Sequence, residues 1–285
     1  MIITICICGA GTMGRGIAQE AAQSDFNVIL FDVSVSAIDK AKVIIEKNLQ
    51  YLVDKEKISS AEKIEIYNRI QFTSDIKKCM GEIIIEAIAE FEDAKINLFN
   101  ELAKYNNEEV IFASNTSSLS ISSLQRKIVF PQRVVGMHFF NPAYIMKLVE
   151  VVKGNQTDDN IATAVYDICL QMNKVPVICK DAPGFIVNRI ARHYYLEALK
   201  LAEDGIASYE DIDAVLEATG FKMGPFKLMD LIGMDINLAV SQSLYNAFDK
   251  TERFKPSSVQ IKKVKDGELG KKTGKGFYNY PNQKI

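Results

Sequence analysis

The chain has 285 residues, of which 48% are hydrophobic and 25% are charged, and its mean hydropathy is zero. This composition is typical of a folded globular protein and excludes a disordered or fibrous chain, and the length is sufficient for two domains. With 34 basic and 36 acidic residues the net charge is −2, so the balance favours neither nucleic acid nor an anionic membrane surface as a partner.

The N-terminus and the cysteines predict a cytoplasmic protein. The N-terminal segment lacks basic residues and leads directly into a glycine motif, so it does not resemble a signal peptide. No apolar stretch approaches the ~20 residues that cross a bilayer. The five cysteines form no Cys-x-x-Cys pair, and buried free thiols in a reducing compartment are therefore expected.

Short β-branched runs alternate with longer helical patterns over the first half of the chain. This alternation is typical of a parallel sheet whose strands are joined by crossover helices. Residues 34–69 interrupt it with two helical segments, which predict a helical hairpin inserted into the sheet. The expected strands are residues 3–8, 27–32, 83–87, 110–113, 133–138 and 149–152.

The pattern changes at about residue 182. No strand is expected after residues 175–179, and the segments beyond have helical spacing. These helical segments are residues 185–204, 208–219 and 225–249. The sequence therefore predicts an α/β domain over residues 1–182 and an all-helical domain over residues 183–285.

A glycine-rich segment follows the first expected strand and precedes a helical pattern. It reads G-x-G-x-x-G, the fingerprint of dinucleotide-binding folds, in the strand-turn-helix context that the fingerprint needs. Glycines permit the tight turn and the close approach of the backbone to a pyrophosphate at the helix N-terminus. The second strand ends at Asp32, whose carboxylate can accept the ribose hydroxyls and repels a 2′-phosphate, so NAD is favoured over NADP. The motif comprises Gly9, Ala10, Gly11, Thr12, Met13 and Gly14.

One of the two histidines lies where catalysis is expected. His138 closes a predicted core strand, at the sheet edge where ligands of open α/β sheets gather. Glu150 lies one expected strand away, and a carboxylate bound to an imidazole fixes its tautomer and raises its basicity. His193 lies in a helical stretch without such neighbours, so a packing or surface role is expected for it.

A hydroxyl-rich loop, Ser114–Ser120, follows another expected strand at the same edge. Helix capping accounts for one of its hydroxyls but not for the rest or for Asn115. A serine nucleophile with His138 as its base is disfavoured, because the G-x-S-x-G elbow is absent and a nucleotide fold predicts redox chemistry.

Taken together, the motifs resemble those of the short-chain L-3-hydroxyacyl-CoA dehydrogenases, most of all the bacterial 3-hydroxybutyryl-CoA dehydrogenases. The resemblance runs in family order from residue 9 to residue 280 and implies an NAD-binding Rossmann-type domain, a helical domain that closes the cleft, and a homodimer. The matching segments are GAGTMGRGIA (9–18), IIEAIAE (84–90), ASNTSSLSI (113–121), GMHFFNPAYIMKLVEVV (136–152), DAPGFIVNRI (181–190) and KKTGKGFYNY (271–280).

The resemblance implies an oxidoreductase that interconverts (S)-3-hydroxybutyryl-CoA and acetoacetyl-CoA with NAD(H). His138 would exchange the proton of the 3-hydroxyl while a hydride passes between the β-carbon and the nicotinamide, and Glu150 would hold His138. Ser117 and Asn188 would bind the substrate oxygens. The implied cofactor contacts besides the glycine loop and Asp32 are Glu90, Lys95, Asn115, Ser117, Asn141 and Lys272. No metal is implied.

The helical hairpin at residues 34–69 resembles the family's CoA-binding arm. Lys55 offers it an ammonium group for a CoA phosphate. Some family members carry a second lysine four positions earlier, where this chain has Tyr51. The acyl-CoA contacts of the arm therefore depart from the family pattern at this one position.

Three alternatives stay open at this point. A longer-chain 3-hydroxyacyl-CoA dehydrogenase of β-oxidation would carry the same motifs. β-Hydroxyacid and 6-phosphogluconate dehydrogenases share the two-domain plan, but they use a lysine where this chain has His138. A catalytically idle NAD-binding structural protein is disfavoured by the joint presence of Ser117, His138, Glu150 and Asn188.

Overall fold

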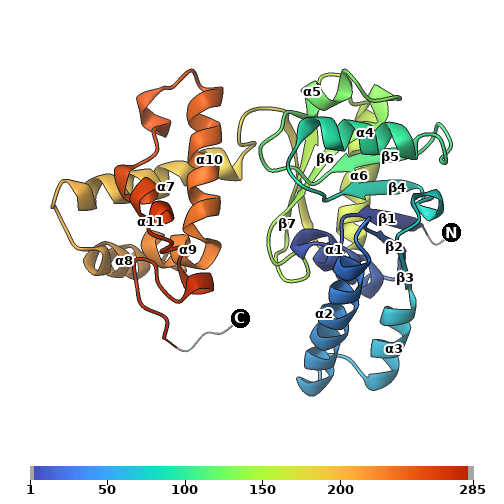
Figure 1. The fold of residues 1–285 in the computed structure, drawn as a ribbon, viewed down its shortest axis with the longest axis horizontal. Coiled ribbons are helices and arrows are strands. Elements are labelled where there is room, and N and C mark those ends of the chain that lie inside the picture. The colour runs from blue at the N-terminus through green and yellow to red at the C-terminus, as the bar shows by residue number, and fades with distance from the viewer. Residues whose placement is uncertain (1–2, 282–285) are drawn as a thin grey trace. The chain divides into compact units, whose positions relative to one another are not determined.

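The computed structural model describes residues 3–281, and the chain forms two compact units, residues 1–182 and 183–285. Within the described residues, the first unit is built on an eight-stranded sheet in the order β3-β2-β1-β4-β5-β6-β7-β8 (Figure 1). Neighbouring strands are parallel except β6 and β7, which are antiparallel. The strands are β1 (Thr4–Cys8), β2 (Asn27–Phe31), β3 (Ile70–Thr73), β4 (Ile83–Glu86), β5 (Ile111–Ser114), β6 (Val134–Phe139), β7 (Leu148–Lys153) and β8 (Val175–Lys180).

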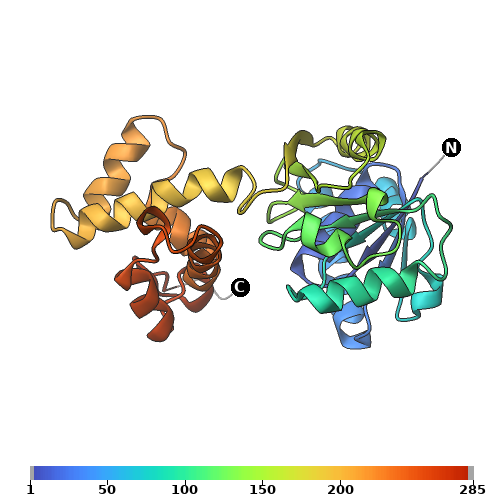
Figure 2. The same cartoon turned by 90° about the horizontal axis from the view of Figure 1, so that it is seen from above.

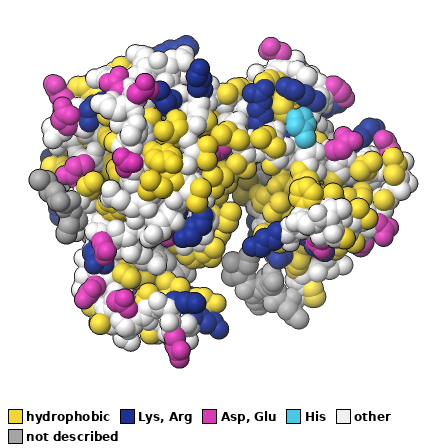
Figure 3. Space-filling view, turned by 180° about the vertical axis from the view of Figure 1, so that it is seen from behind, with side chains coloured by type: hydrophobic (Ala, Val, Ile, Leu, Met, Phe, Trp, Pro, Cys, Tyr) yellow, Lys and Arg dark blue, Asp and Glu magenta, His cyan; other side chains and the backbone are white. Residues whose placement is uncertain are grey.

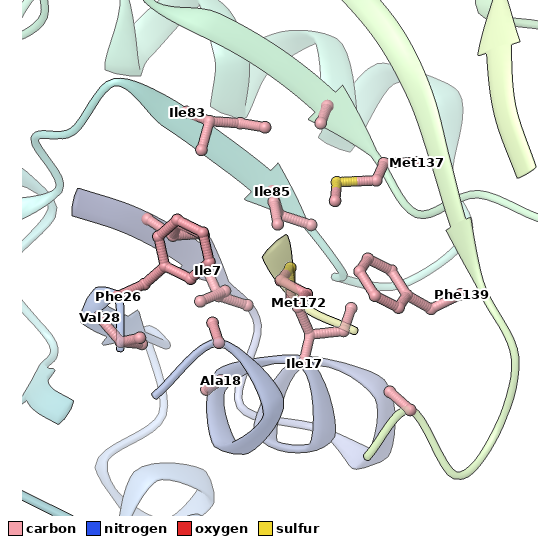
Figure 4. Packing of buried hydrophobic residues seen from close by; sticks show 14 of the residues in the cluster. Ile7, Ile17, Ala18, Phe26, Val28, Ile83, Ile85, Met137, Phe139 and Met172 are labelled. Atoms are coloured by element: carbon pink, nitrogen blue, oxygen red, sulfur yellow. The ribbon is translucent and has the colours of Figure 1, made fainter. Parts of the chain in front are cut away.

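Helices cover both faces of this sheet (Figure 2). Helices α1 (Thr12–Gln23) and α6 (Asp159–Gln171) lie on one face, and α4 (Glu92–Leu102) and α5 (Ile121–Gln125) lie on the other. The central strands are runs of isoleucine and valine because a sheet with crossover helices is buried on both sides. Figure 4 shows this core, where Ile17 of α1 lies among apolar side chains of the sheet. Two short 3₁₀ segments, η1 (Ile76–Lys78) and η2 (Pro131–Arg133), complete the unit.

The predicted helical hairpin is present as α2 (Val35–Asp54) and α3 (Ser60–Asn68). Ser34 caps α2, since its Oγ accepts a hydrogen bond from the amide of Ala37 at 3.3 Å. Ser59 and Glu62 form a capping box at the start of α3, which satisfies two amides that the first turn leaves unpaired. The insertion therefore has its own start signals, and the prediction of a hairpin is confirmed.

The predicted fold class is confirmed, with two differences in the sheet. The sheet is mixed rather than parallel, because residues 140–147 between β6 and β7 are fewer than the dozen or more that a parallel crossover needs. Strand β3 was not predicted. It has four residues, follows α3 without a turn signal and exposes Gln71, so it carries little strand pattern.

The second unit is helical throughout its described residues, apart from isolated bridges. Its elements are α7 (Val187–Glu203), α8 (Tyr209–Ala218), α9 (Pro225–Ile232), α10 (Met234–Ala247), α11 (Ser258–Lys265), η3 (Glu252–Phe254) and η4 (Lys271–Thr273). The expected continuous helix over residues 225–249 is two helices, because Gly233 has a φ of +103° that ends α9. Buried Asp230 accepts hydrogen bonds from the amides of Phe277 and Tyr278, each at 2.9 Å, and so fixes the closing segment of the chain.

Hydrophobic side chains also gather on part of the surface of the second unit (Figure 3). The exposed hydrophobic residues of the second unit include Phe221, Leu231 and Ile236, each at least half exposed. None of the helices over residues 3–281 combines the length and the apolar character that crossing a membrane requires.

Candidate active site

The carboxyl ends of β1, β4, β5 and β6 meet at one edge of the sheet, and the loops that leave them build the site. The first loop is the glycine motif between β1 and α1. Gly9 has a φ of +108°, and an added Cβ would lie 2.5 Å from the carbonyl oxygen of Ala87. At Gly14 an added Cβ would lie 1.7 Å from the carbonyl oxygen of Gly9. Both positions therefore require glycine for the turn itself.

Gly11 differs from Gly9 and Gly14, because its surroundings leave room for a dinucleotide. An added Cβ there meets no atom within 4 Å, so the turn itself does not require glycine at this position. Gly11 is also the N-cap of α1 and supplies no side chain to the amides of Thr12 and Met13 in the first turn. An open space beside uncapped amides fits a pyrophosphate, which such helix ends bind.

Asp32 lies directly after β2 and faces this loop. Its Oδ2 accepts a hydrogen bond from the amide of Ala10 at 2.8 Å, and its Oδ1 accepts one from the amide of Ser34, also at 2.8 Å. The carboxylate is therefore held beside the glycine loop, where the fold places the ribose hydroxyls of a dinucleotide.

A charge network centred on a buried lysine connects the next two loops. Lys95 of α4 is 1% exposed, and its Nζ lies 2.5 Å from Oε1 of Glu86 and 3.0 Å from Oε2 of Glu90. Glu86 ends β4 and accepts a further hydrogen bond from Ser114 Oγ at 2.7 Å. Lys95 thus compensates the negative charges of two carboxylates and connects the loops that carry them.

Glu90 holds the hydroxyl-rich loop after β5. Its Oε1 accepts hydrogen bonds from Thr116 Oγ1 at 2.5 Å, from the amides of Ser117 and Ser118 at 3.1 and 3.3 Å, and from Ser118 Oγ at 2.9 Å. Burial acts to raise the pKa of Glu90, but the charge of Lys95 and these donors outweigh it, so the pKa lies below its ordinary value. Glu90 is therefore ionised at neutral pH and fixes the loop conformation around Ser117.

The histidine and glutamate are directly paired across β6 and β7. His138 and Glu150 are opposite residues of the antiparallel register, and His138 Nδ1 lies 2.7 Å from Glu150 Oε2. Both side chains are buried, and the imidazole lies 4.5 Å, between centroids, from the ring of Phe140. A carboxylate at Nδ1 selects the tautomer whose basic nitrogen is Nε2. Asn115 Oδ1 accepts a hydrogen bond from the amide of Phe139 at 2.9 Å, which connects the hydroxyl-rich loop to the end of β6.

A second buried cation fixes the loop that follows His138. Lys174 Nζ lies 2.7 Å from Oε1 of Glu20 on α1 and donates to the carbonyl oxygens of Ala143 and Met146 at 2.7 and 3.1 Å. Asn141 lies in the same loop and is exposed. The loop is therefore anchored to the helix that begins at the glycine motif.

The remaining predicted residues lie elsewhere. Lys55 is an exposed residue at the end of α2, with its Nζ 5.7 Å from the centre of the Tyr51 ring. Tyr51 lines an open groove of the hairpin together with Lys47 and Lys63. In the second unit, Asn188 is half-buried in the first turn of α7, and Lys272 pairs with the carboxylate of Asp235. Apart from Lys55, the predicted residues of the first unit thus lie at one sheet edge.

Three residues that shape the site, Glu86, Glu20 and Lys174, were not predicted from the sequence. The sequence does carry a signal for Glu86. A charged residue that closes an otherwise apolar strand, Ile83–Glu86, is expected to be buried and to require a buried partner. No comparable signal marked Glu20 or Lys174. They are distant in sequence, and each looks like an ordinary surface charge of a helix or a turn.

Comparison with known proteins identifies the family. Residues 4–182 match the family model of the 3-hydroxyacyl-CoA dehydrogenase NAD binding domain, and residues 184–280 match that of the 3-hydroxyacyl-CoA dehydrogenase C-terminal domain. The chain is 42% identical over 279 residues to 3-hydroxyadipyl-CoA dehydrogenase of Escherichia coli, covering 97% of this chain and 59% of that protein.

Two further relatives match over nearly their whole length. The chain is 39% identical to 3-hydroxybutyryl-CoA dehydrogenase of Clostridioides difficile, covering 97% of this chain and 99% of that one. The crystal structure of an (S)-3-hydroxybutyryl-CoA dehydrogenase from Ralstonia eutropha superimposes with a TM-score of 0.94 at 38% identity, covering 99% of this chain and 100% of that one. The chain belongs to the 3-hydroxyacyl-CoA dehydrogenase family of NAD-binding oxidoreductases.

Proposed function

We propose that the protein is an (S)-3-hydroxybutyryl-CoA dehydrogenase, which interconverts 3-hydroxybutyryl-CoA and acetoacetyl-CoA. The observation that supports this most is the His138–Glu150 pair, 2.7 Å apart at the sheet edge that also carries the glycine loop. The C. difficile and R. eutropha relatives are named for this reaction and match over nearly their whole length.

In this proposal His138 Nε2 accepts the proton of the 3-hydroxyl when the alcohol is oxidised and returns it to the oxygen when the ketone is reduced. Glu150 holds the imidazole at Nδ1 and stabilises the imidazolium form. Bound NAD supplies the hydride acceptor, and NADH the hydride donor. Ser117 and Asn188 bind the substrate oxygens, and Lys95 acts through Glu90 by holding the loop that presents Ser117.

NAD is proposed over NADP because of Asp32. Its carboxylate is held by two amides beside the glycine loop, and a negative charge there repels a 2′-phosphate. Glu90, Asn115, Asn141 and Lys272 are the further cofactor contacts that we propose. Only family resemblance supports these four contacts.

The remaining roles follow the architecture. Residues 1–182 would bind NAD, with the hairpin at 34–69 holding the CoA moiety, and residues 183–285 would serve substrate closure and dimerisation. Two exposed lysines of the hairpin, Lys47 and Lys55, offer charges to CoA phosphates, and the half-buried Lys63 lines the same groove as Lys47. The exposed apolar residues of the second unit support a homodimer, and five free cysteines support a reducing, cytoplasmic compartment.

The test is oxidation of NADH by acetoacetyl-CoA, with NADPH, 3-ketoadipyl-CoA and longer 3-ketoacyl-CoAs run beside it. His138→Gln should lower kcat by about 100- to 10,000-fold, the usual contribution of a general base. His193→Gln, at the exposed second histidine, is the matched control and should keep kcat. Full activity of His138→Gln would overturn the mechanism. Faster turnover of a longer or dicarboxylic substrate would replace the substrate assignment and leave the mechanism in place.

A further inference from the structure

Three cysteines meet in the interior of the first unit, on the sheet face opposite α1. Cys6 and Cys8 belong to β1 and, being two residues apart on a strand, point to the same face. Cys79 comes from the segment between η1 and β4. All three side chains are fully buried, and their Sγ atoms lie within 4.8 Å of one another.

The surroundings of this three-thiol cluster provide no further ligand side chain. Over residues 3–281, no histidine or carboxylate joins the three sulfurs in a common site. The contact that Cys79 Sγ makes outside the cluster is to the carbonyl oxygen of Asp75, at 3.9 Å. The neighbouring Lys77 and Lys78 are exposed to solvent. A bound ion would therefore have three sulfur ligands in a dry interior.

Charge decides which ion such a cluster takes. Three thiolates leave one negative charge with a divalent zinc ion and two with a monovalent copper ion, and burying net charge is costly. Zinc also prefers four ligands in structural sites. A trivalent thiophilic element, by contrast, forms a neutral three-coordinate complex with three thiolates. Soft ligands of this kind favour soft acceptors.

We propose that Cys6, Cys8 and Cys79 form a binding site for a trivalent thiophilic element, represented by arsenic(III). Arsenous acid would exchange its three hydroxyl groups for the three sulfurs. Three As–O bonds break, three As–S bonds form, and each thiol proton leaves with a hydroxyl group as water. No electrons are transferred and no co-reactant is needed.

The geometry of β1 disfavours a disulfide between Cys6 and Cys8. A rise of ~3.3 Å per residue separates the Cα atoms of Cys6 and Cys8 by about 6.6 Å. That value is close to about 6.8 Å, the upper end of disulfide geometry. Because β1 is paired on both sides, with β2 and β4, the strand cannot bend to shorten the separation. A ligand that bridges the sulfurs needs no such movement.

The test uses the full-length protein and sodium arsenite. Mass spectrometry under non-denaturing conditions should show one arsenic per chain, with the loss of three waters. X-ray absorption of the wild-type complex should count three sulfur neighbours. Cys79→Ala should lose the bound arsenic, whereas Cys169→Ala, at a buried cysteine of α6 outside the cluster, should retain it. NADH oxidation by each variant reports whether it is folded.

Several outcomes would overturn the site. They are two sulfur neighbours in place of three, retention of arsenic by Cys79→Ala, or zinc bound in preference to arsenite in direct competition. A disulfide in the isolated protein would also overturn it. Because the sulfur count is made on the wild type, it decides the question even where Cys79→Ala fails to fold.

Discussion

Two loops at the same edge of the sheet are built on opposite principles. The glycine loop after β1 depends on the absence of side chains, since an added Cβ at Gly14 would lie 1.7 Å from a backbone oxygen. The hydroxyl-rich loop after β5 depends on the buried charges of Glu86 and Lys95 and on the more exposed Glu90 that Lys95 also contacts. Added atoms should therefore disable the first loop, whereas loss of one charge should disable the second.

The largest effect is expected at the glycine loop. Gly14→Ala should destabilise the fold by more than about 4 kcal/mol, because backbone blocks the new methyl group. Gly11→Ala is the matched control, since its Cβ meets no atom within 4 Å. Gly11→Ala should have the same unfolding temperature as the wild type but a weaker affinity for NADH. Thermal unfolding and NADH titration measure both quantities, and equal stability of the two variants would contradict the distinction.

Removal of the charge under the second loop should come next. Lys95→Met leaves Glu86 buried without its cation and should cost about 3–5 kcal/mol of unfolding free energy. The double variant Glu86→Leu/Lys95→Met removes both charges and should recover a large part of that loss. Chemical denaturation measures both. A double variant as unstable as Lys95→Met alone would show that packing, rather than uncompensated charge, sets the cost.

Two carboxylates should respond to pH with opposite signs. The pKa of Glu90 is lowered in the folded protein, so its ionised form stabilises the fold above the unfolded value of about 4.3. The wild type should therefore have a larger free energy of unfolding than Glu90→Gln at neutral pH. This difference should decrease as the pH falls through the pKa of Glu90 in the folded protein.

Burial raises the pKa of Glu20, against the opposing charge of Lys174. Its contribution is present below about pH 4.3 and is lost as pH rises through the folded pKa. Glu20→Gln should therefore gain stability relative to the wild type as pH rises, the reverse of Glu90→Gln. Chemical denaturation at a series of pH values checks both, and trends of the same sign would contradict the assignments.

The smallest effect is expected on the helical hairpin, away from both loops. Lys55 is exposed, and exposed ion pairs are worth at most about 1 kcal/mol, so Lys55→Ala should raise KM for acetoacetyl-CoA about two- to fivefold. The effect should fade at high salt, and kcat should not change. Lys57→Ala on the same turn is the control. A fall in kcat would place Lys55 in a different role.

The sequence predicted what local pattern encodes. The glycine motif, the strand that leads to Asp32 and the two helical segments of the hairpin each depend on residues close in sequence. The Rossmann-type sheet and the helical second unit follow from periodicity. The spacing of His138 and Glu150 also suggested their proximity, although it did not indicate the antiparallel register that pairs them.

What escaped prediction depends on long-range burial. Lys95 was expected at the cofactor from resemblance alone, and its position between two glutamates became visible only with the sheet assembled. Glu20 and Lys174 meet across the first unit with no shared motif. Burial of a charge is a property of the packed structure, so single-sequence patterns cannot distinguish such residues from surface charges.

The antiparallel pairing of β6 and β7 also governs which changes in chain length this site tolerates. Side chains alternate between the two faces of a strand, so deletion of one residue within β7, ahead of Glu150, would turn that carboxylate to the opposite side of the sheet from His138. An insertion in the connecting loop, residues 140–147, would leave the pairing unchanged. Length variation among functional relatives should therefore be found in that loop and not in the two strands.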